Sequence, residues 1–249
     1  MKYGLIGERL THSFSAEIHY LLGGYEYSLI EVNPSDLAAF MKKRDFDGIN
    51  VTIPYKREVM KYLDSVSQKA EKIGAVNTVV NRGGKLYGYN TDFAGMSALI
   101  KRIGVGLSGR SVMIAGTGGT SATAAAVADS LGAADIKFLS RRSSGGAVTY
   151  DRAAEECFGC SYLINTTPAG MYPNADAGLP LRLADFPQLA GVADAVYNPL
   201  RTGLVLASRG SGIPAEGGLY MLVAQAAAYP FNLISREICH SRHPDAERP

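Results

Sequence analysis

The apolar positions of this chain fall in short runs that alternate with stretches of helical pattern. The runs are rich in Val, Ile and Tyr and stand at 3–6, 27–32, 48–51, 111–115, 136–139, 162–165 and 192–196. Such alternation is typical of strand–helix–strand units, which build parallel sheets. The pattern therefore predicts an α/β fold.

Two local signals add detail to the first part of the chain. Asn33-Pro34 offers an N-cap and a first-turn proline for a helix near 35–43. Gly83-Gly84 stands between the segments 79–81 and 85–89, which predicts a hairpin. The first part should therefore contain both parallel and antiparallel strands.

The order of the elements predicts two lobes. A helix over 91–103 and a Gly-rich passage at 104–109 precede a second set of strands. The last helix, over 219–238, is apolar on most of one side and long enough to pack back on the first lobe. We therefore expect one lobe from 1–92 plus 219–249 and a second from 93–218. The polar tail at 240–249 is expected to fray.

Composition and charge exclude several classes of protein. The 249 residues include 25 Lys and Arg against 23 Asp and Glu, without a long run of one sign, which gives no support to a nucleic-acid partner. No apolar run approaches the ~18 residues of a membrane span. No secretory pattern opens the chain, so we expect a cytoplasmic protein without a membrane partner.

Three cysteines argue against a disulfide framework. Cys157 and Cys160 form a lone Cys-x-x-Cys, which could be half a zinc site or a redox pair. Because a second pair and a nearby histidine are missing, the spacing favours free thiols beside a turn.

The segment 112–122 reads as an apolar strand, a Gly-rich turn and an Ala-rich helix. Glycines let the backbone approach a pyrophosphate, and the helix N-terminus offers N–H groups to the anion. In this context the turn predicts a dinucleotide site. Its third small position is Ser121 or Ala122 rather than the usual glycine, which widens the expected contact between helix and strand.

The end of the next strand indicates which dinucleotide is bound. A site for NAD usually places an acidic residue there to bond the ribose 2′-hydroxyl. This chain has Ser140-Arg141-Arg142 instead. Two guanidinium groups and nearby hydroxyls suit a 2′-phosphate and therefore NADP. The alternative is a solvated basic loop.

Polar residues also gather at predicted strand and helix ends in the first lobe. Ser13 and Ser15 precede a helix, where they could cap it or hold a carboxylate. Thr52 and Lys56 follow a strand, at the edge where parallel sheets bind ligands.

Asn77 and Asp92 add an amide and a carboxylate at the two ends of the hairpin. Reduction of a ketone leaves negative charge on oxygen, so a proton donor must stand beside it. A lysine in a partly enclosed pocket, oriented by a carboxylate, can supply that proton.

Eight motifs resemble, in order, those of the shikimate dehydrogenases. They are HSFS, NVTIPYK, IGAVNTVV, YNTDFAGM, GTGGTS, INTTPAGM, DAVYNPLRT and GGLYMLVAQA, and they span roughly 4–225. The resemblance implies a substrate-binding and catalytic domain at 1–92 plus 219–249 and a Rossmann-type NADP-binding domain at 93–218. It implies the reversible reduction of 3-dehydroshikimate to shikimate with NADPH, a step of aromatic amino-acid biosynthesis.

The resemblance also implies a role for each matching residue. Lys56 and Asp92 become the catalytic pair. The substrate carboxylate falls to Ser13, Ser15 and Tyr197, and the ring hydroxyls fall to Thr52, Asn77, Asp92 and Gln225. The NADP side is formed by Gly116, Thr117, Gly118, Gly119, Thr120, Ser121, Ser140, Arg141, Arg142 and Gly218, with Asn165, Thr166 and Met171 at the nicotinamide end.

Several departures leave alternatives open. Ser140 stands where the family motif commonly has Asn, 142–162 is short for the helix usual there, and Pro230 interrupts the last helix. A quinate/shikimate dehydrogenase that uses NAD is one alternative, although Ser15 rather than threonine favours shikimate. A dinucleotide-binding regulator without catalysis is another, against which the retained Lys56 and Asp92 count. We expect a small-molecule substrate, no metal, and a monomer or homodimer.

Overall fold

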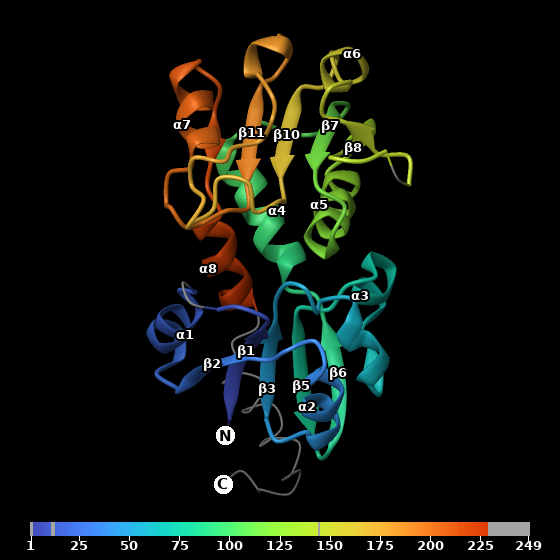
Figure 1. Ribbon diagram of the computed structural model, residues 1–249, viewed down its shortest axis with the longest axis vertical. Coiled ribbons are helices and arrows are strands. Elements are labelled where there is room, and N and C mark those ends of the chain that lie inside the picture. Colours follow the sequence, from blue (N-terminus) through green and yellow to red (C-terminus); the bar gives the residue numbers. More distant parts are fainter. Residues whose placement is uncertain (1, 11–12, 144, 229–249) are drawn as a thin grey trace, which may run out of the picture. The chain divides into compact units, whose positions relative to one another are not determined.

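The computed structural model describes residues 2–10, 13–143 and 145–228, and Figure 1 shows its elements. The described chain divides into two compact units. Of the described residues, the first unit contains those in 2–71, 76–91 and 226–228, and the second contains those in 72–75 and 92–225. His12, the expected helix beyond 228 with its Pro230, and the tail at 240–249 lie outside the described residues.

The first unit is built on a mixed sheet. Its described strands are β1 (Tyr3–Gly7), β2 (Tyr27–Glu31), β3 (Gly48–Val51), β4 (Ser65–Val66), β5 (Thr78–Arg82) and β6 (Lys85–Tyr89), in the order β2-β1-β3-β5-β6-β4. Strand β1 pairs in parallel with β2 and β3, whereas β5 pairs antiparallel with β3 and β6. The expected hairpin and the mixture of strand directions are confirmed.

Helices cover both faces of this sheet. They are α1 (Ser15–Gly23), α2 (Leu37–Lys43), the 3₁₀ helix η1 (Glu58–Tyr62) and α3 (Gln68–Ile73). Leu37 and Met41 of α2 pack with Ile6 and Ile49 in one apolar cluster. Tyr3 and Leu5 face the opposite side, where Ala16 of α1 joins their cluster. Side chains of one strand thus alternate between two cores.

The start of α2 differs from the expectation of a helix from 35 with an Asn33 cap. The N–H of Asp36 donates to the Asn33 carbonyl at 2.9 Å, and the helix begins at Leu37. Because the fixed φ of Pro34 also suits the second position of a β-turn, the Asn-Pro signal produced a turn before the helix.

The second unit is a parallel sheet with helices on both faces. Its described strands are β7 (Ser111–Ala115), β8 (Asp135–Ser140), β9 (Val148–Thr149), β10 (Tyr162–Asn165), β11 (Gly191–Asp194) and β12 (Ala215–Glu216). The order β12-β11-β10-β7-β8-β9 reverses direction between β7 and β10. This is the Rossmann order, in which ligands bind at the carboxyl ends of the strands beside that reversal.

The strands of this sheet are apolar on both sides because both faces are covered. Val112 and Ile114 pack with α4 (Asp92–Ile103) and α5 (Gly119–Ser130), while Met113 and Ala115 pack with α6 (Ala153–Glu156) and α7 (Gly203–Gly210). Helix α8 (Leu219–Ala228) adds Met221 to the first of these clusters. Figure 1 shows β7, β10 and β11 as neighbouring arrows with one direction.

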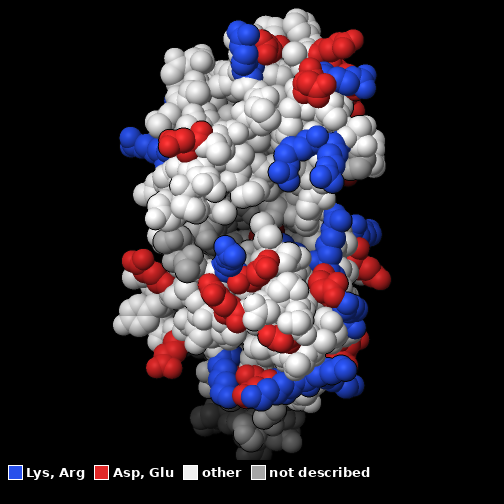
Figure 2. All heavy atoms as spheres, in the orientation of Figure 1, with Lys and Arg blue, Asp and Glu red and all other residues white. Residues whose placement is uncertain are grey.

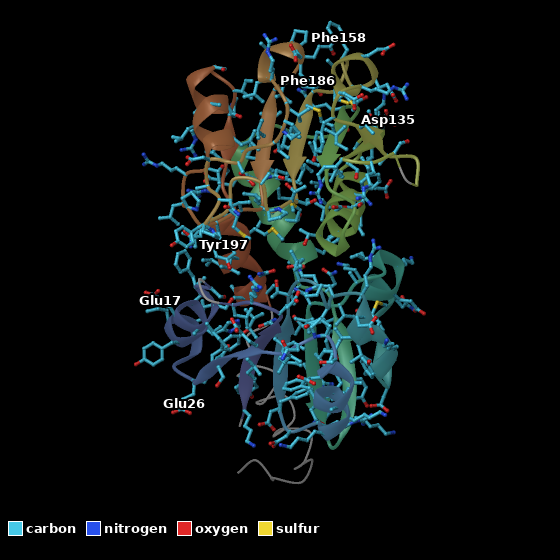
Figure 3. All side chains as sticks on the ribbon, viewed as in Figure 1. Glu17, Glu26, Asp135, Phe158, Phe186 and Tyr197 are labelled. Carbon is cyan, nitrogen blue, oxygen red and sulfur yellow. The ribbon has the colours of Figure 1, made fainter. Side chains whose placement is uncertain are left out.

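The segment between β8 and β10 is compact, holding only β9 and the four-residue α6 among its described residues. Cys157 and Cys160 follow α6 as free thiols buried in the core. Phe158, between them, is exposed (Figure 3). Among the residues described, no helix combines the length and hydropathy needed to cross a membrane.

Candidate active site

The Gly-rich turn stands at the carboxyl end of β7, next to the strand-order reversal. Gly116 has φ +112°, a conformation that side chains rarely adopt, and a Cβ there would lie 2.7 Å from Thr166 Oγ1. A Cβ on Gly118 would meet no atom within 4 Å, so open space lies before the start of α5. An exposed backbone beside a helix N-terminus fits a pyrophosphate.

Ser121 explains the departure from the usual third glycine. Its hydroxyl oxygen accepts the N–H of Gly118 at 3.2 Å and lies 2.7 Å from Thr166 Oγ1. Because the Thr166 hydroxyl donates to the Ala115 carbonyl at 2.6 Å, the proton between the two hydroxyls must come from Ser121. The buried serine therefore ties the Gly-rich turn to the end of β10.

The end of β8 carries the predicted basic pair. Ser140 is its last residue, and Arg141 and Arg142 follow as exposed side chains. The Ser140 hydroxyl accepts the Arg142 N–H at 3.5 Å, a long bond that turns the chain there. Since β8 neighbours β7, this strand end lies beside the one that carries the Gly-rich turn. Its residues fit a 2′-phosphate, and no acidic side chain follows the strand directly.

Asn165 and Asp194 end the neighbouring strands β10 and β11 and are paired in register. Both are fully buried, and Asn165 Nδ2 donates to Asp194 Oδ1 at 2.9 Å. The other carboxylate oxygen accepts the Thr202 hydroxyl at 2.6 Å. Burial raises the pKa of Asp194 to about 6, against the lowering effect of hydrogen bonds from Thr202, Val196 and Asn165.

Two more residues expected around NADP, Met171 and Gly218, and one expected at the substrate carboxylate, Tyr197, follow strands of the same sheet. Met171 follows β10 in a turn and is exposed. Gly218 donates to the Val196 carbonyl at 2.9 Å, and a Cβ there would lie 2.2 Å from the Ala195 oxygen, so only glycine fits. Tyr197, labelled in Figure 3, stands in the segment between β11 and α7 and is half-buried.

Ser13 and Ser15 lie at the start of α1, as expected. The Ser13 hydroxyl accepts the Ser15 N–H at 3.2 Å and donates to Ser15 Oγ at 3.0 Å. Ser15 is buried and Ser13 half-buried. The Ser13 hydroxyl thus satisfies the first N–H group of the helix, and the two hydroxyl oxygens lie next to each other.

The carboxyl ends of β1 and β3 meet at Thr52. Its N–H donates to the Ile6 carbonyl at 2.9 Å, and a Cβ on Gly7 would lie 2.6 Å from Thr52 Cγ2. The glycine therefore lets the threonine side chain lie directly against β1. Thr52 is half-buried at this edge.

Hydrogen bonds bring the chain around Lys56 close to the end of the hairpin. The Lys56 carbonyl accepts the Val76 N–H at 2.8 Å. The next residue, Asn77, accepts the Thr91 N–H on Oδ1 at 2.7 Å and donates to Thr91 Oγ1 at 3.0 Å. Asp92 follows directly and is buried in the first turn of α4.

A second polar network supports Asn77 from within the first unit. Asn50 accepts the Tyr27 hydroxyl at 2.7 Å and donates to the Asn77 carbonyl at 3.2 Å. The ring of His19 stacks on Tyr27 with centroids 4.1 Å apart. Burial lowers the pKa of His19 to about 4, partly opposed by its hydrogen bond with Asn50.

Sequence reasoning assigned no role to Asn50, Asp194 or Thr202. Asp194 carried a usable signal, because a charged residue ends an otherwise apolar strand. Within the described ranges, no three His, Cys, Asp or Glu side chains gather as metal ligands would. On the face shown in Figure 2, basic and acidic side chains are interspersed, in line with the balanced composition.

Comparison with known proteins shows the family. The family model of the shikimate dehydrogenase substrate binding domain matches residues 5–79. The shikimate dehydrogenase (NADP(+)) of Clostridium beijerinckii is 37% identical over 240 residues, which cover 90% of this chain and 88% of that protein.

Solved structures agree with this similarity over nearly the whole chain. Shikimate dehydrogenase 1 from Peptoclostridium difficile matches with a TM-score of 0.83 at 32% identity, covering 97% of this chain and 92% of that one. Shikimate 5-dehydrogenase from Thermus thermophilus, in complex with NADP(H) and shikimate, matches with a TM-score of 0.81 at 29% identity, covering 94% and 92%. The chain belongs to the shikimate dehydrogenase family.

Proposed function

We propose that this protein is an NADP-dependent oxidoreductase that reduces 3-dehydroshikimate to shikimate in aromatic amino-acid biosynthesis. The observation that carries the proposal is the carboxyl edge of the second sheet, where a Gly-rich turn and a basic strand end stand on neighbouring strands. Family membership supplies the substrate, because the relatives are named for shikimate and NADP.

The cofactor supplies the hydride, and the protein supplies position and a proton. Gly116, Thr117, Gly118, Gly119, Thr120 and Ser121 hold the pyrophosphate. Ser140, Arg141 and Arg142 hold the 2′-phosphate, which the planar guanidinium groups can bond with two donors each. Asn165, Thr166 and Met171 shape the nicotinamide end, and Gly218 belongs to the cofactor-binding residues.

The substrate is held by its carboxylate and its ring hydroxyls. Ser13, Ser15 and Tyr197 bind the carboxylate, and Thr52, Asn77, Asp92 and Gln225 bind the hydroxyls. Lys56 donates a proton to the ketone oxygen as the oxygen becomes a hydroxyl, and Asp92 orients the lysine and takes part in the proton transfer. Proximity of the backbone supports this pairing: the Lys56 carbonyl accepts the Val76 N–H, and the next residue, Asn77, accepts the N–H of Thr91, which precedes Asp92.

The remaining expectations belong to the same proposal. Residues 1–92 plus 219–249 form the substrate-binding and catalytic domain, and 93–218 form the NADP-binding domain. The free thiols of Cys157 and Cys160 suit the reducing cytoplasm. The protein works as a monomer or a homodimer on a small-molecule substrate.

The test is an absorbance assay of nicotinamide reduction with shikimate or quinate, each with NADP and NAD. The proposal expects the highest kcat/KM for shikimate with NADP. Higher kcat/KM for quinate with NAD would favour a quinate/shikimate dehydrogenase. Tight NADPH binding without turnover of either substrate would indicate a regulator instead.

A further inference from the structure

Asp194 is a buried carboxylate of the second unit whose two oxygens accept three hydrogen bonds. Its Oδ1 accepts the Asn165 amide at 2.9 Å and the Val196 N–H at 3.0 Å. Its Oδ2 accepts the Thr202 hydroxyl at 2.6 Å. The carboxylate is fully buried, and these donors come from the ends of two strands and the start of a helix.

The amide of Asn165 links the Asp194 carboxylate to the turn after β10. Asn165 Oδ1 accepts the N–H of Thr167 at 3.0 Å and its hydroxyl at 2.7 Å. The Thr167 hydroxyl in turn accepts the Ala169 N–H at 3.2 Å. An amide group donates through its nitrogen and accepts through its oxygen. Because the Asp194 carboxylate binds Asn165 Nδ2, the oxygen Oδ1 is the atom that faces Thr167.

Thr202 links the Asp194 carboxylate to the start of α7. Its hydroxyl oxygen accepts the Val205 N–H at 3.3 Å as the N-cap of that helix. With its proton donated to Asp194, the Thr202 hydroxyl can serve the helix only as an acceptor. One carboxylate therefore orients side chains on both sides of β11.

We infer that Asp194 is a positioning residue, which holds the turn at 165–169 in the conformation that faces the nicotinamide end of NADP. The inference rests on the proposed function for the identity of that ligand. The turn lies beside the Gly-rich turn, since Thr166 bonds both Ala115 and Ser121. A small displacement at such a place lowers turnover more than binding, because the rest of the dinucleotide is held elsewhere.

The experiment compares Asp194→Ala and Asp194→Asn with wild type and with Asp129→Asn, a control on the exposed end of α5. Asp194→Ala should lower kcat by about 10²-fold while the Kd of NADP changes less than about threefold. Asp194→Asn keeps an acceptor for Asn165 and offers a donor to Thr202. It should therefore recover kcat to within about tenfold of wild type.

Hydrogen exchange gives a readout that needs no turnover. The amides of Thr167 and Ala169 should lose protection in Asp194→Ala, keep most of it in Asp194→Asn, and keep all of it in Asp129→Asn. If Asp194→Ala fails to fold, Thr202→Val removes one donor to the carboxylate, and Thr202→Ser retains it. The valine variant alone should then show the loss of protection and of kcat.

The outcomes separate the two proposals. Absence of turnover in wild type, with the exchange pattern as expected, would contradict the proposed function and leave Asp194 as the residue that orders the turn. Unchanged protection at Thr167 and Ala169 in Asp194→Ala would overturn the inference. Equal fold losses of kcat and NADP affinity would overturn it too, because they would indicate general damage to the unit.

Discussion

The Ser121 hydroxyl donates to Thr166 Oγ1 across 2.7 Å and so joins the Gly-rich turn to the end of β10. The residue at this position is commonly glycine in dinucleotide-binding turns, where it allows close packing of helix on strand. In this protein the serine replaces part of that packing with two hydrogen bonds, one from Gly118 and one to Thr166.

The first prediction concerns this serine. Ser121→Ala should lower the free energy of unfolding by about 1–2 kcal/mol and weaken NADP binding by up to about tenfold, because Gly118 and Thr166 lose a buried partner. Urea unfolding and fluorescence titration with NADPH measure the two effects. Ser130→Ala is the control, because the Ser130 hydroxyl donates to the Val127 carbonyl of its own helix. Wild-type NADP affinity in Ser121→Ala would show that the bond does not shape the turn.

The second prediction concerns cofactor choice. Replacing Arg141 and Arg142 together by alanine should weaken NADPH binding by about 10²-fold and NADH binding by less than about threefold, because only NADPH carries the 2′-phosphate. Arg182→Ala, an exposed arginine elsewhere in the same unit, is the control. Equal losses for both cofactors would contradict the phosphate assignment.

The third prediction concerns proton transfer. Lys56→Ala should lower kcat by about 10²–10⁴-fold and leave the KM for shikimate nearly unchanged, since we propose that the lysine acts on the reacting oxygen. Lys42→Ala, on the exposed side of α2, should behave as wild type. Steady-state kinetics with shikimate and NADP give the answer, and a Lys56→Ala enzyme with normal kcat would remove Lys56 from the mechanism.

The fourth prediction concerns acid stability of the first unit. Burial lowers the pKa of His19 to about 4 from 6.5, so the folded state holds the ring neutral. The contribution of His19 to the free energy of unfolding is fully present above pH 6.5. It decreases by about 3 kcal/mol as the pH falls toward 4. His19→Gln should flatten that part of the profile in urea unfolding at a series of pH values. An identical acid slope in the variant would mean that His19 does not titrate as described.

The fifth prediction concerns Asp194, whose effect on stability has the opposite pH dependence to that of His19. Burial raises the pKa of Asp194 from 3.8 to about 6, so the folded state favours the protonated carboxyl. The contribution of Asp194 to the free energy of unfolding is fully present below pH 3.8. It decreases by about 3 kcal/mol as the pH rises through about 6. Relative to wild type, Asp194→Asn should therefore gain stability between about pH 4 and about pH 7. Parallel profiles for the two proteins would rule out this titration.

Much of the fold was readable from local pattern. The alternation of apolar runs determined the strands, and the Gly-rich turn before an Ala-rich helix predicts where a dinucleotide binds. Ser140-Arg141-Arg142 indicated NADP because the chemistry of a strand end depends on only a few consecutive residues. The motifs around Lys56 and Asp92 identified the family.

Tertiary structure decided which polar side chains hold one another. Asn165 and Asp194, or Ser121 and Thr166, are far apart in sequence and meet only when β10 pairs with its neighbours. No periodicity marks such a meeting. The sequence by itself determined the strands and the chemical groups, because these depend on neighbouring residues. Only packing of distant segments decided which groups are buried and how they are oriented.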